Sequence, residues 1–241
     1  MSTIFPKWTN QIPTAVALSA GFVFVLVVAG AWYYVTPDFW RGGYMPEQPV
    51  NYSHQLHAGQ LGIDCRYCHT HVEESYSANV PATQTCMNCH TAVDSKSGYL
   101  KKALSADGTS ASAHWASADL ARVRTAYASG TPIEWRRVHK APDYVQFPHV
   151  AHLKAGVSCY SCHARIDTMP VVFQAKGMGM GFCLDCHRNP EKSVIDTAQV
   201  RITDLRAVQE RLASADQARA GAALVEQKNL QPPQHCGACH Y

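Results

Sequence analysis

The sequence has little charge and no basic stripe. Asp, Glu, Lys and Arg together make up 16% of the 241 residues, and runs of Lys and Arg never exceed two residues. A nucleic-acid-binding surface would need such a stripe or patch. Strand-like runs are also scarce, and all ten cysteines fall in one repeated motif, so none remains for a structural disulfide. The sequence therefore gives no support to a nucleic-acid-binding domain or to a disulfide-stapled β domain.

Charge is missing altogether near the N-terminus. No charged residue occurs between Trp8 and Pro37, and residues 13–35 are almost wholly apolar. As a helix, this segment would span about 35 Å, enough to cross the hydrocarbon core of a bilayer, which is about 30 Å thick. Aromatic residues stand near both ends, as in interfacial belts. We therefore predict a cytoplasmic tail over residues 1–12 and a transmembrane anchor helix over residues 13–35.

A cleaved signal peptide is the alternative to an anchor, with Ala29-Gly30-Ala31 as its cleavage site. The apolar run is long for the core of a signal peptide, which favours a retained anchor. Lys7 precedes the run, while Asp38 and Arg41 follow it. This distribution favours an N-terminus inside the cell and a body outside it.

Five C-x-x-C-H motifs use all ten cysteines. This is the signature of covalent haem c attachment, in which two thiols one turn apart bond to the haem vinyl groups and the adjoining histidine binds the iron. The cysteines are Cys65 and Cys68, Cys86 and Cys89, Cys159 and Cys162, Cys183 and Cys186, and Cys236 and Cys239. The proximal histidines are His69, His90, His163, His187 and His240. Structural zinc also uses paired cysteines, but it does not require a histidine after every second one. The sequence thus predicts five haems c and, because bacteria attach them outside the cytoplasmic membrane, a periplasmic body.

Two segments of the chain repeat one another. Residues 52–69 read YSHQLHAGQLGIDCRYCH and residues 147–163 read FPHVAHLKAGVSCYSCH, and a second haem motif follows each. The chain is therefore interpreted as a duplicated two-haem module with a fifth haem appended. The predicted units are a first module (48–95), a connecting segment (96–138), a second module (139–195) and a helix with the fifth-haem segment (196–241).

The repeat includes an H-x-x-H pair in front of each first motif. A six-coordinate haem needs a distal ligand, and neutral imidazole is the usual one. Histidines at i and i+3 diverge on a helical turn, so that they can reach two different irons. We predict that the distal ligands include His54, His57, His149 and His152.

Four distal histidines leave one iron without a distal ligand. Met180 lies three residues before Cys183 in a glycine-rich turn where the backbone can approach a cofactor closely. His139 is the other candidate and would otherwise bond a haem propionate. Both residues remain candidates for the fifth distal ligand, and Met180 is preferred.

Regular structure is expected to be sparse. A short helix is predicted over residues 119–127, ended by Gly130, and a second is predicted to begin at Asp204-Leu205 with Thr203 as its cap. Five haems would supply much of the core of the body. The predicted fold class is a multihaem cytochrome c, mainly α and irregular with little β, on one N-terminal transmembrane helix.

Together these motifs resemble the membrane-anchored pentahaem cytochrome c subunit of bacterial alternative complex III, a quinol:electron-acceptor oxidoreductase. The resemblance lies in YSHQLHAGQLGIDCRYCH, TCMNCH, PIEWRRVHKAPDYVQFPHVAH, GFCLDCHRNPE and LQPPQHCGACHY. The H-x-x-H pairs alone match the wider cytochrome c3/c7-like group. Phe182 departs from the family, which has Trp at that position.

The resemblance implies that this chain is an electron-transfer subunit and not an enzyme by itself. Its partners would be polytopic quinol-binding subunits, an iron–sulfur subunit and monohaem cytochromes, and its acceptor would be a periplasmic carrier or a terminal oxidase. Two other functions stay open from the sequence. One is a direct quinol dehydrogenase of the small tetrahaem kind, and the other is a multihaem reductase with one open iron.

Overall fold

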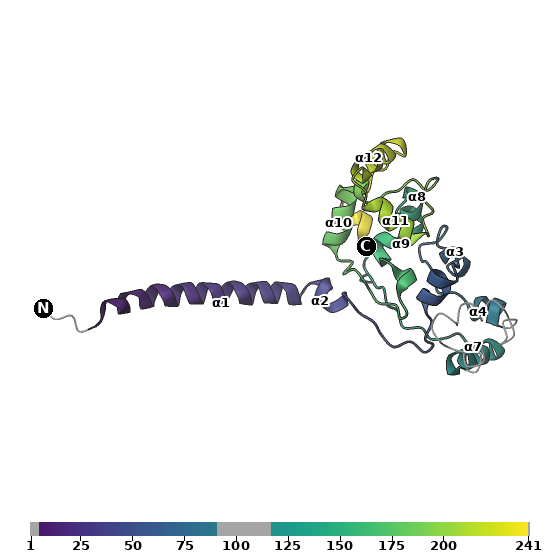
Figure 1. Ribbon diagram of the computed structural model, residues 1–241, viewed down its shortest axis with the longest axis horizontal. Helices are drawn as coiled ribbons and strands as arrows, with labels where there is room; N and C mark the ends of the chain where they lie inside the picture. The colour runs from purple at the N-terminus through teal and green to yellow at the C-terminus, as the bar shows by residue number, and fades with distance from the viewer. Residues whose placement is uncertain (1–4, 91–116, 241) are drawn as a thin grey trace.

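The structure, a computed structural model, describes residues 5–90 and 117–240. A long helical rod projects from a body of short helices (Figure 1). The rod begins with one 3-10 turn, η1 (Lys7–Gln11), and continues as α1 (Ile12–Tyr34). Residues 96–116 of the predicted connecting segment lie outside the described residues, as do the last residues of the first module.

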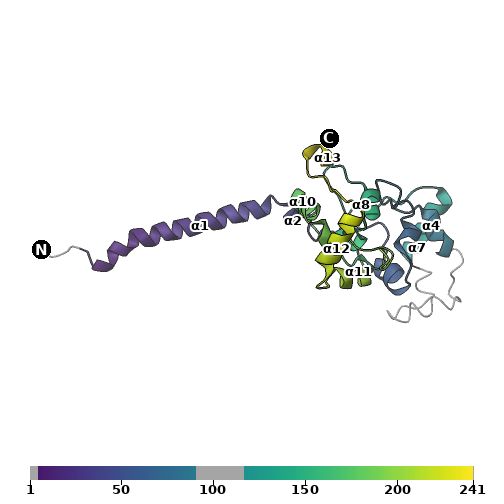
Figure 2. The same ribbon diagram turned by 90° about the horizontal axis from the view of Figure 1, so that it is seen from above.

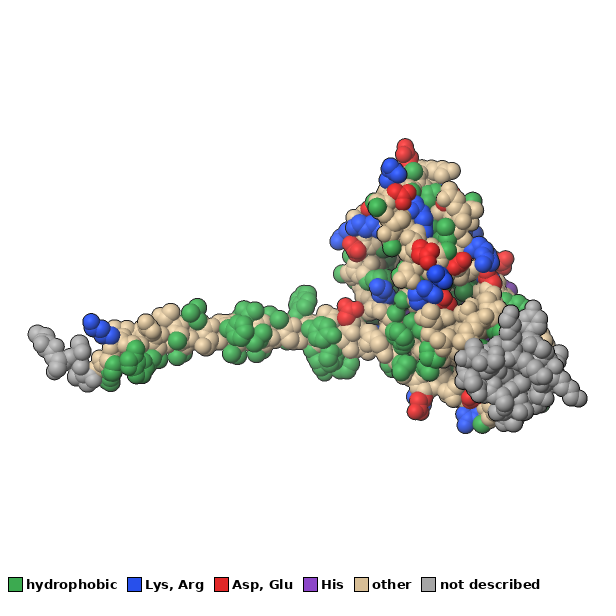
Figure 3. All heavy atoms as spheres, viewed as in Figure 1, with side chains coloured by type: hydrophobic (Ala, Val, Ile, Leu, Met, Phe, Trp, Pro, Cys, Tyr) green, Lys and Arg blue, Asp and Glu red, His purple; other side chains and the backbone are tan. Residues whose placement is uncertain are grey.

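The apolar helix predicted over residues 13–35 is present as α1. Lys7–Tyr34 forms one continuous helical stretch, and its most apolar 18-residue window has a mean hydropathy of 2.4 and is not buried against the protein. Figure 3 shows this contrast, with hydrophobic side chains along the rod and charged side chains gathered on the body. It is the one described helix that is long and apolar enough to cross a membrane.

The rod meets the body at α2 (Pro37–Arg41). Thr36 is extended and Pro37 occupies the first turn, as expected where one helix stops and another begins. Two backbone hydrogen bonds tie the residues after α2 to the body, from Gly43 N to Gln174 O at 2.8 Å and from Gln174 N to Tyr44 O at 3.0 Å. As a result α2 lies beside α10 in both views (Figures 1 and 2).

The body consists of short helices separated by irregular chain. In order these are the π-helical turn η2 (Gln55–Gln60), α3 (Cys65–Cys68), α4 (Thr83–His90), α7 (Ala118–Ser129), α8 (His149–Ala155), α9 (Cys159–His163), η3 (Ile166–Thr168), α10 (Met180–Arg188), η4 (Pro190–Lys192), α11 (Leu205–Leu212), α12 (Gln217–Gln227) and α13 (Cys236–Cys239). The described residues form no strand, only two isolated bridges. The predicted fold class, mainly α and irregular, is confirmed.

The helix predicted over residues 119–127 is present as α7. The Ser117 hydroxyl accepts a hydrogen bond from Leu120 N, and Gly130 ends the helix with a φ of 67°. Its buried Val123 packs with Val50 and Met87 of the first module. This small apolar cluster lies at the end of the body away from α1 (Figures 1 and 2).

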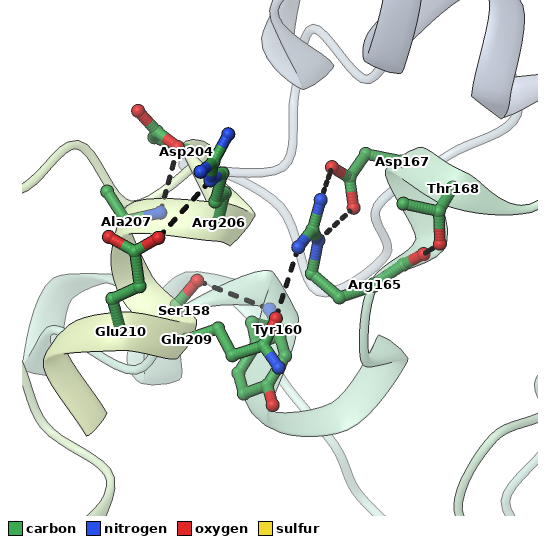
Figure 4. Close-up of polar contacts among 10 residues, drawn as sticks. All are labelled: Ser158, Tyr160, Arg165, Asp167, Thr168, Asp204, Arg206, Ala207, Gln209 and Glu210. Atoms are coloured by element: carbon green, nitrogen blue, oxygen red, sulfur yellow. Dashed lines mark hydrogen bonds and ion pairs between the residues drawn. The ribbon is translucent and has the colours of Figure 1, made fainter. Parts of the chain in front are cut away.

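The helix predicted after Thr203 is present as α11, but its cap was predicted wrongly. The Asp204 carboxylate accepts a hydrogen bond from Ala207 N at 3.1 Å and so caps the helix (Figure 4). Thr203 instead donates its hydroxyl to Asp64 at 2.7 Å. A carboxylate is the stronger acceptor for a helix N-terminus, and Thr203 is used to join α11 to the first haem motif.

Candidate functional site

Each C-x-x-C-H motif lies on one helical turn, which places its two thiols on one side. Two of these turns carry a side-chain cap directly before the first cysteine. Asp64 accepts a hydrogen bond from Arg66 N at 3.0 Å. Figure 4 shows the second cap, in which Ser158 accepts a hydrogen bond from Tyr160 N at 3.2 Å. The Ser158 hydroxyl also donates to Ile202 O at 2.6 Å, so that the third motif is fixed to the segment before α11.

One connected cavity joins the motifs. Its volume is about 2960 Å³, and its wall includes all ten cysteines, the five proximal histidines and the four histidines of the H-x-x-H pairs. A pocket for one small ligand usually has about 300–1,000 Å³. All ten cysteines are free thiols. In the part of the chain that the structure describes, no three His, Cys, Asp or Glu side chains converge to hold a metal ion directly. The residues present therefore fit several large cofactors attached through thiols.

The two H-x-x-H pairs have the same aromatic surroundings. The Tyr52 ring lies 4.9 Å from the first histidine, His54, at 86°, and 4.4 Å from the second, His57, at 23°. Phe147 repeats this arrangement, 4.9 Å and 85° from His149, and 4.4 Å and 31° from His152. In each module one aromatic ring thus stacks on the second histidine and stands perpendicular to the first.

The second histidine of each pair faces a proximal histidine. The ring centroids of His57 and His90 are 6.2 Å apart, and those of His152 and His187 are 6.1 Å apart. Two imidazoles that bind one metal from opposite sides, with metal–nitrogen bonds of about 2 Å, have centroids about 6 Å apart. Both pairs therefore have the spacing of axial ligands to a shared iron.

Hydrogen bonds orient five of the cavity histidines. In each, Nδ1 lies close to a backbone carbonyl oxygen: His57 and Ser53 at 2.8 Å, His69 and Asn79 at 2.5 Å, His149 and Tyr76 at 2.8 Å, His152 and Pro148 at 2.9 Å, and His187 and Pro233 at 2.6 Å. Because a carbonyl only accepts, these contacts place the proton on Nδ1. Nε2 then presents its lone pair, as a metal ligand requires.

Burial favours the neutral form of the imidazoles. It lowers the pKa of His54 to about 4, and it lowers the pKa of His163 to about 3. The pKa of His152 is also lowered, again mainly by burial. A neutral imidazole is the form that binds a metal.

The two candidates for the fifth distal ligand lie in different surroundings. Met180 begins α10, and its side chain is 68% exposed beside the cavity. The His139 ring is perpendicular to the His163 ring with centroids 4.3 Å apart, a distance too short for a shared iron. Burial lowers the pKa of His139 to about 4, and its Nε2 is buried without a hydrogen-bond partner in the described part of the chain.

Some features of the site were not anticipated from the sequence. Tyr52 and Phe147 are the first residues of the two repeated segments, but their stacking on the histidines was not predicted. The caps Asp64 and Ser158 were also missed, although a residue that can cap a helix directly before a C-x-x-C-H motif is a visible signal.

Comparison with known proteins points to the same class of protein. The sequence model of the Class III cytochrome C family matches residues 40–117. The chain is also similar to the menaquinone reductase multiheme cytochrome c subunit of Nitratidesulfovibrio vulgaris. The two are 28% identical over 164 residues, which cover 59% of this chain and 69% of the relative. Both similarities are to cytochromes c, in agreement with the short helices and the connected cavity lined by the C-x-x-C-H motifs.

Proposed function

We propose that this chain, a multihaem cytochrome c, is an electron-transfer subunit that carries five haems c for a quinone-linked membrane complex. The observation that carries the proposal is the single cavity whose wall holds every cysteine and every predicted axial histidine. Haem, when bound, supplies one-electron exchange at its iron. The chain attaches it through the thiols and positions the imidazoles. The relative named as a menaquinone reductase subunit supports the link to quinone.

The histidine spacings support specific axial pairs. His57 serves the iron whose proximal ligand is His90, and His152 serves the iron of His187. The first histidines of the two pairs, His54 and His149, then serve the motifs that follow them in the chain, with proximal ligands His69 and His163.

The fifth iron, with proximal ligand His240, takes Met180 in this proposal. The short contact between His139 and His163 argues against an iron shared by these two histidines. The alternative is that His139 reaches the fifth iron and that Met180 is a surface residue. A methionine ligand would give one haem a higher potential than its bis-histidine neighbours.

In its finer form, the proposal follows the resemblance to alternative complex III. The anchor α1 holds the body on the periplasmic face of the cytoplasmic membrane. Polytopic subunits oxidise quinol, and this chain relays the electrons to a periplasmic carrier or a terminal oxidase. In a second candidate function, electrons pass through the same haem sites in the opposite direction and reduce quinone, as the name of the relative suggests.

The proposal is tested by adding a quinol analogue to the isolated chain and to the native membrane complex while haem absorbance is followed. We expect five haems by pyridine haemochrome assay and intact mass. We also expect reduction by quinol only in the complex, blocked there by quinone-site inhibitors. Fast reduction of the isolated chain would instead show a direct quinol dehydrogenase. Turnover of a small substrate such as nitrite would show a reductase with an open iron. Quinone reduction by a reduced soluble carrier would select the reverse direction.

A further inference from the structure

The fourth haem motif is seated against the chain that leaves the rod. The segment before α10 runs beside α2 so closely that a Cβ on Gly177 would overlap the Asp38 carboxylate. A Cβ on Gly179 would lie 3.0 Å from Pro37 Cγ. The absence of a side chain at both glycines allows this close approach, and α10 follows directly with Cys183, Cys186 and His187. No other haem motif is joined to α2 by contacts of this kind among the described residues.

Contacts between motifs connect the fourth motif to both neighbours. On one side, His187 donates from Nδ1 to Pro233 O at 2.6 Å, three residues before Cys236 of the fifth motif. On the other side, His187 faces His152, which lies on α8 immediately before the third motif, at 6.1 Å. The fourth motif thus lies between the fifth and the third.

The first and third motifs meet at the centre of the body. The side chains of Cys65 and Cys159 lie next to one another, and Thr203, just before α11, donates its hydroxyl to Asp64 directly before Cys65. Two reciprocal backbone hydrogen bonds also join the two modules. Gln55 N, within the first H-x-x-H pair, donates to Met169 O at 3.0 Å. His149 N, at the start of the second pair, donates to Tyr76 O at 3.0 Å. Each histidine pair is therefore fixed by the loop that follows the first motif of the other module.

The second motif lies beyond the first, at the far end of the body. Asn88, between the cysteines of the second motif, donates to the Tyr67 hydroxyl, between those of the first, at 3.4 Å. The motif ends α4, which lies beside α7 away from the rod in both views (Figures 1 and 2).

We infer that the five haem sites form one path in the spatial order fifth, fourth, third, first, second, and that the fourth site exchanges electrons with the membrane partner. This inference rests on the proposed electron-transfer function. A quinol bound by the partner loses two electrons and two protons to become quinone. The electrons pass singly to ferric haem at the Cys183–Cys186 site, and an oxidised soluble carrier removes them, while the partner releases the two protons to solvent.

The order is tested by removing one attachment site at a time in the full chain within its native complex. Each variant replaces both cysteines of one motif with alanine, and the fraction of its four remaining haems that quinol reduces during turnover is measured. We expect no reduction in C183A/C186A, reduction of two haems in C159A/C162A, three in C65A/C68A, and four in both C86A/C89A and C236A/C239A. Dithionite must reduce all four in each variant, which controls for assembly. Extensive reduction by quinol in C183A/C186A would overturn the inference.

A second measurement covers variants that fail to mature. A photo-crosslinking amino acid replaces Trp40 on α2, and a matched variant carries it at Tyr127 on α7. We expect crosslinks to a polytopic subunit from position 40 only, and crosslinks to that subunit from position 127 only would contradict the inference. Failure of quinol to reduce the unmodified complex would instead contradict the proposed function, so the two failures are distinguishable.

Discussion

In the first module Tyr52 stacks on His57, and in the second Phe147 stacks on His152, with the same centroid distance of 4.4 Å. The hydrogen bonds of the leading histidines differ, however. His149 has Nδ1 2.8 Å from Tyr76 O, whereas His54 Nδ1 is buried without a partner among the described residues. Duplication has thus kept the packing and altered the hydrogen bonding. Because a hydrogen-bonded imidazole is the more basic ligand, we expect that, under the proposed axial assignment, the haem of His149 has a lower potential than the haem of His54.

The largest expected effect comes from breaking the proposed axial pairs, His57 with His90 and His152 with His187, one module at a time. We expect His57→Met and His152→Met each to raise the potential of one haem by on the order of 100 mV, since axial ligands tune haem potentials over about 0.8 V. A thioether stabilises ferrous iron more than imidazole does. Redox titration of the full chain, followed optically, measures the change.

The matched control for this test is His71→Met. The side chain of His71 is 66% exposed and is paired only loosely with Glu74, so this substitution should leave every potential unchanged. If His57→Met also changed no potential, His57 would not be an iron ligand.

A smaller effect is expected from the stacked aromatic rings. Tyr52→Leu and Phe147→Leu remove a ring that fixes the planes of two imidazoles. We expect a loss of about 1 kcal/mol in the free energy of unfolding for each. We also expect a shift in the low-spin EPR g values of the haems that these imidazoles serve.

The exchange variants Tyr52→Phe and Phe147→Tyr separate stacking from polarity. Both keep a ring in place, so the EPR spectra should stay close to that of the unmodified chain. Unchanged g values in the leucine variants would show that the rings do not set the imidazole planes.

Local features of this fold were predictable from the sequence, and contacts distant in the sequence were not. The α7 helix follows from Ser117 and Gly130, the residues directly before and after it, which are start and stop signals local to the helix. The cap of α11 was assigned to Thr203 because two neighbouring residues can both cap. The choice depends on Asp64, which lies 139 residues away and takes the Thr203 hydroxyl.

In the candidate site, too, local features were predictable from the sequence and contacts between distant residues were not. The spacing of cysteines and histidines along the chain indicates which side chains face the shared cavity, since each motif is a single helical turn. The pairing of His57 with His90 and the contact of Cys65 with Cys159 depend on how the two modules interlock. No residue pattern within either module encodes that arrangement.

The smallest expected effect concerns the caps of the first and third motifs. Asp64 accepts hydrogen bonds from Arg66 Nε at 2.9 Å and Nη2 at 3.1 Å, and these bonds lower its pKa below the usual value near 4. The corresponding cap in the second module, Ser158, is a neutral hydroxyl. The first motif should therefore be the acid-sensitive one.

The sign follows from the lowered pKa. In the unfolded state the Asp64 carboxylate takes up a proton at a higher pH than it does in the folded state, so the stabilisation is complete above about pH 4 and declines as the pH falls below it. We expect Asp64→Ala to lower the free energy of unfolding by about 1 kcal/mol at pH 7 and by less at pH 3. Ser158→Ala should show a cost that does not change over this range. Denaturant unfolding followed by circular dichroism at both pH values measures the difference. A cost at Asp64 that is independent of pH would mean that its charge does not stabilise the motif, and that the two modules differ here in composition only.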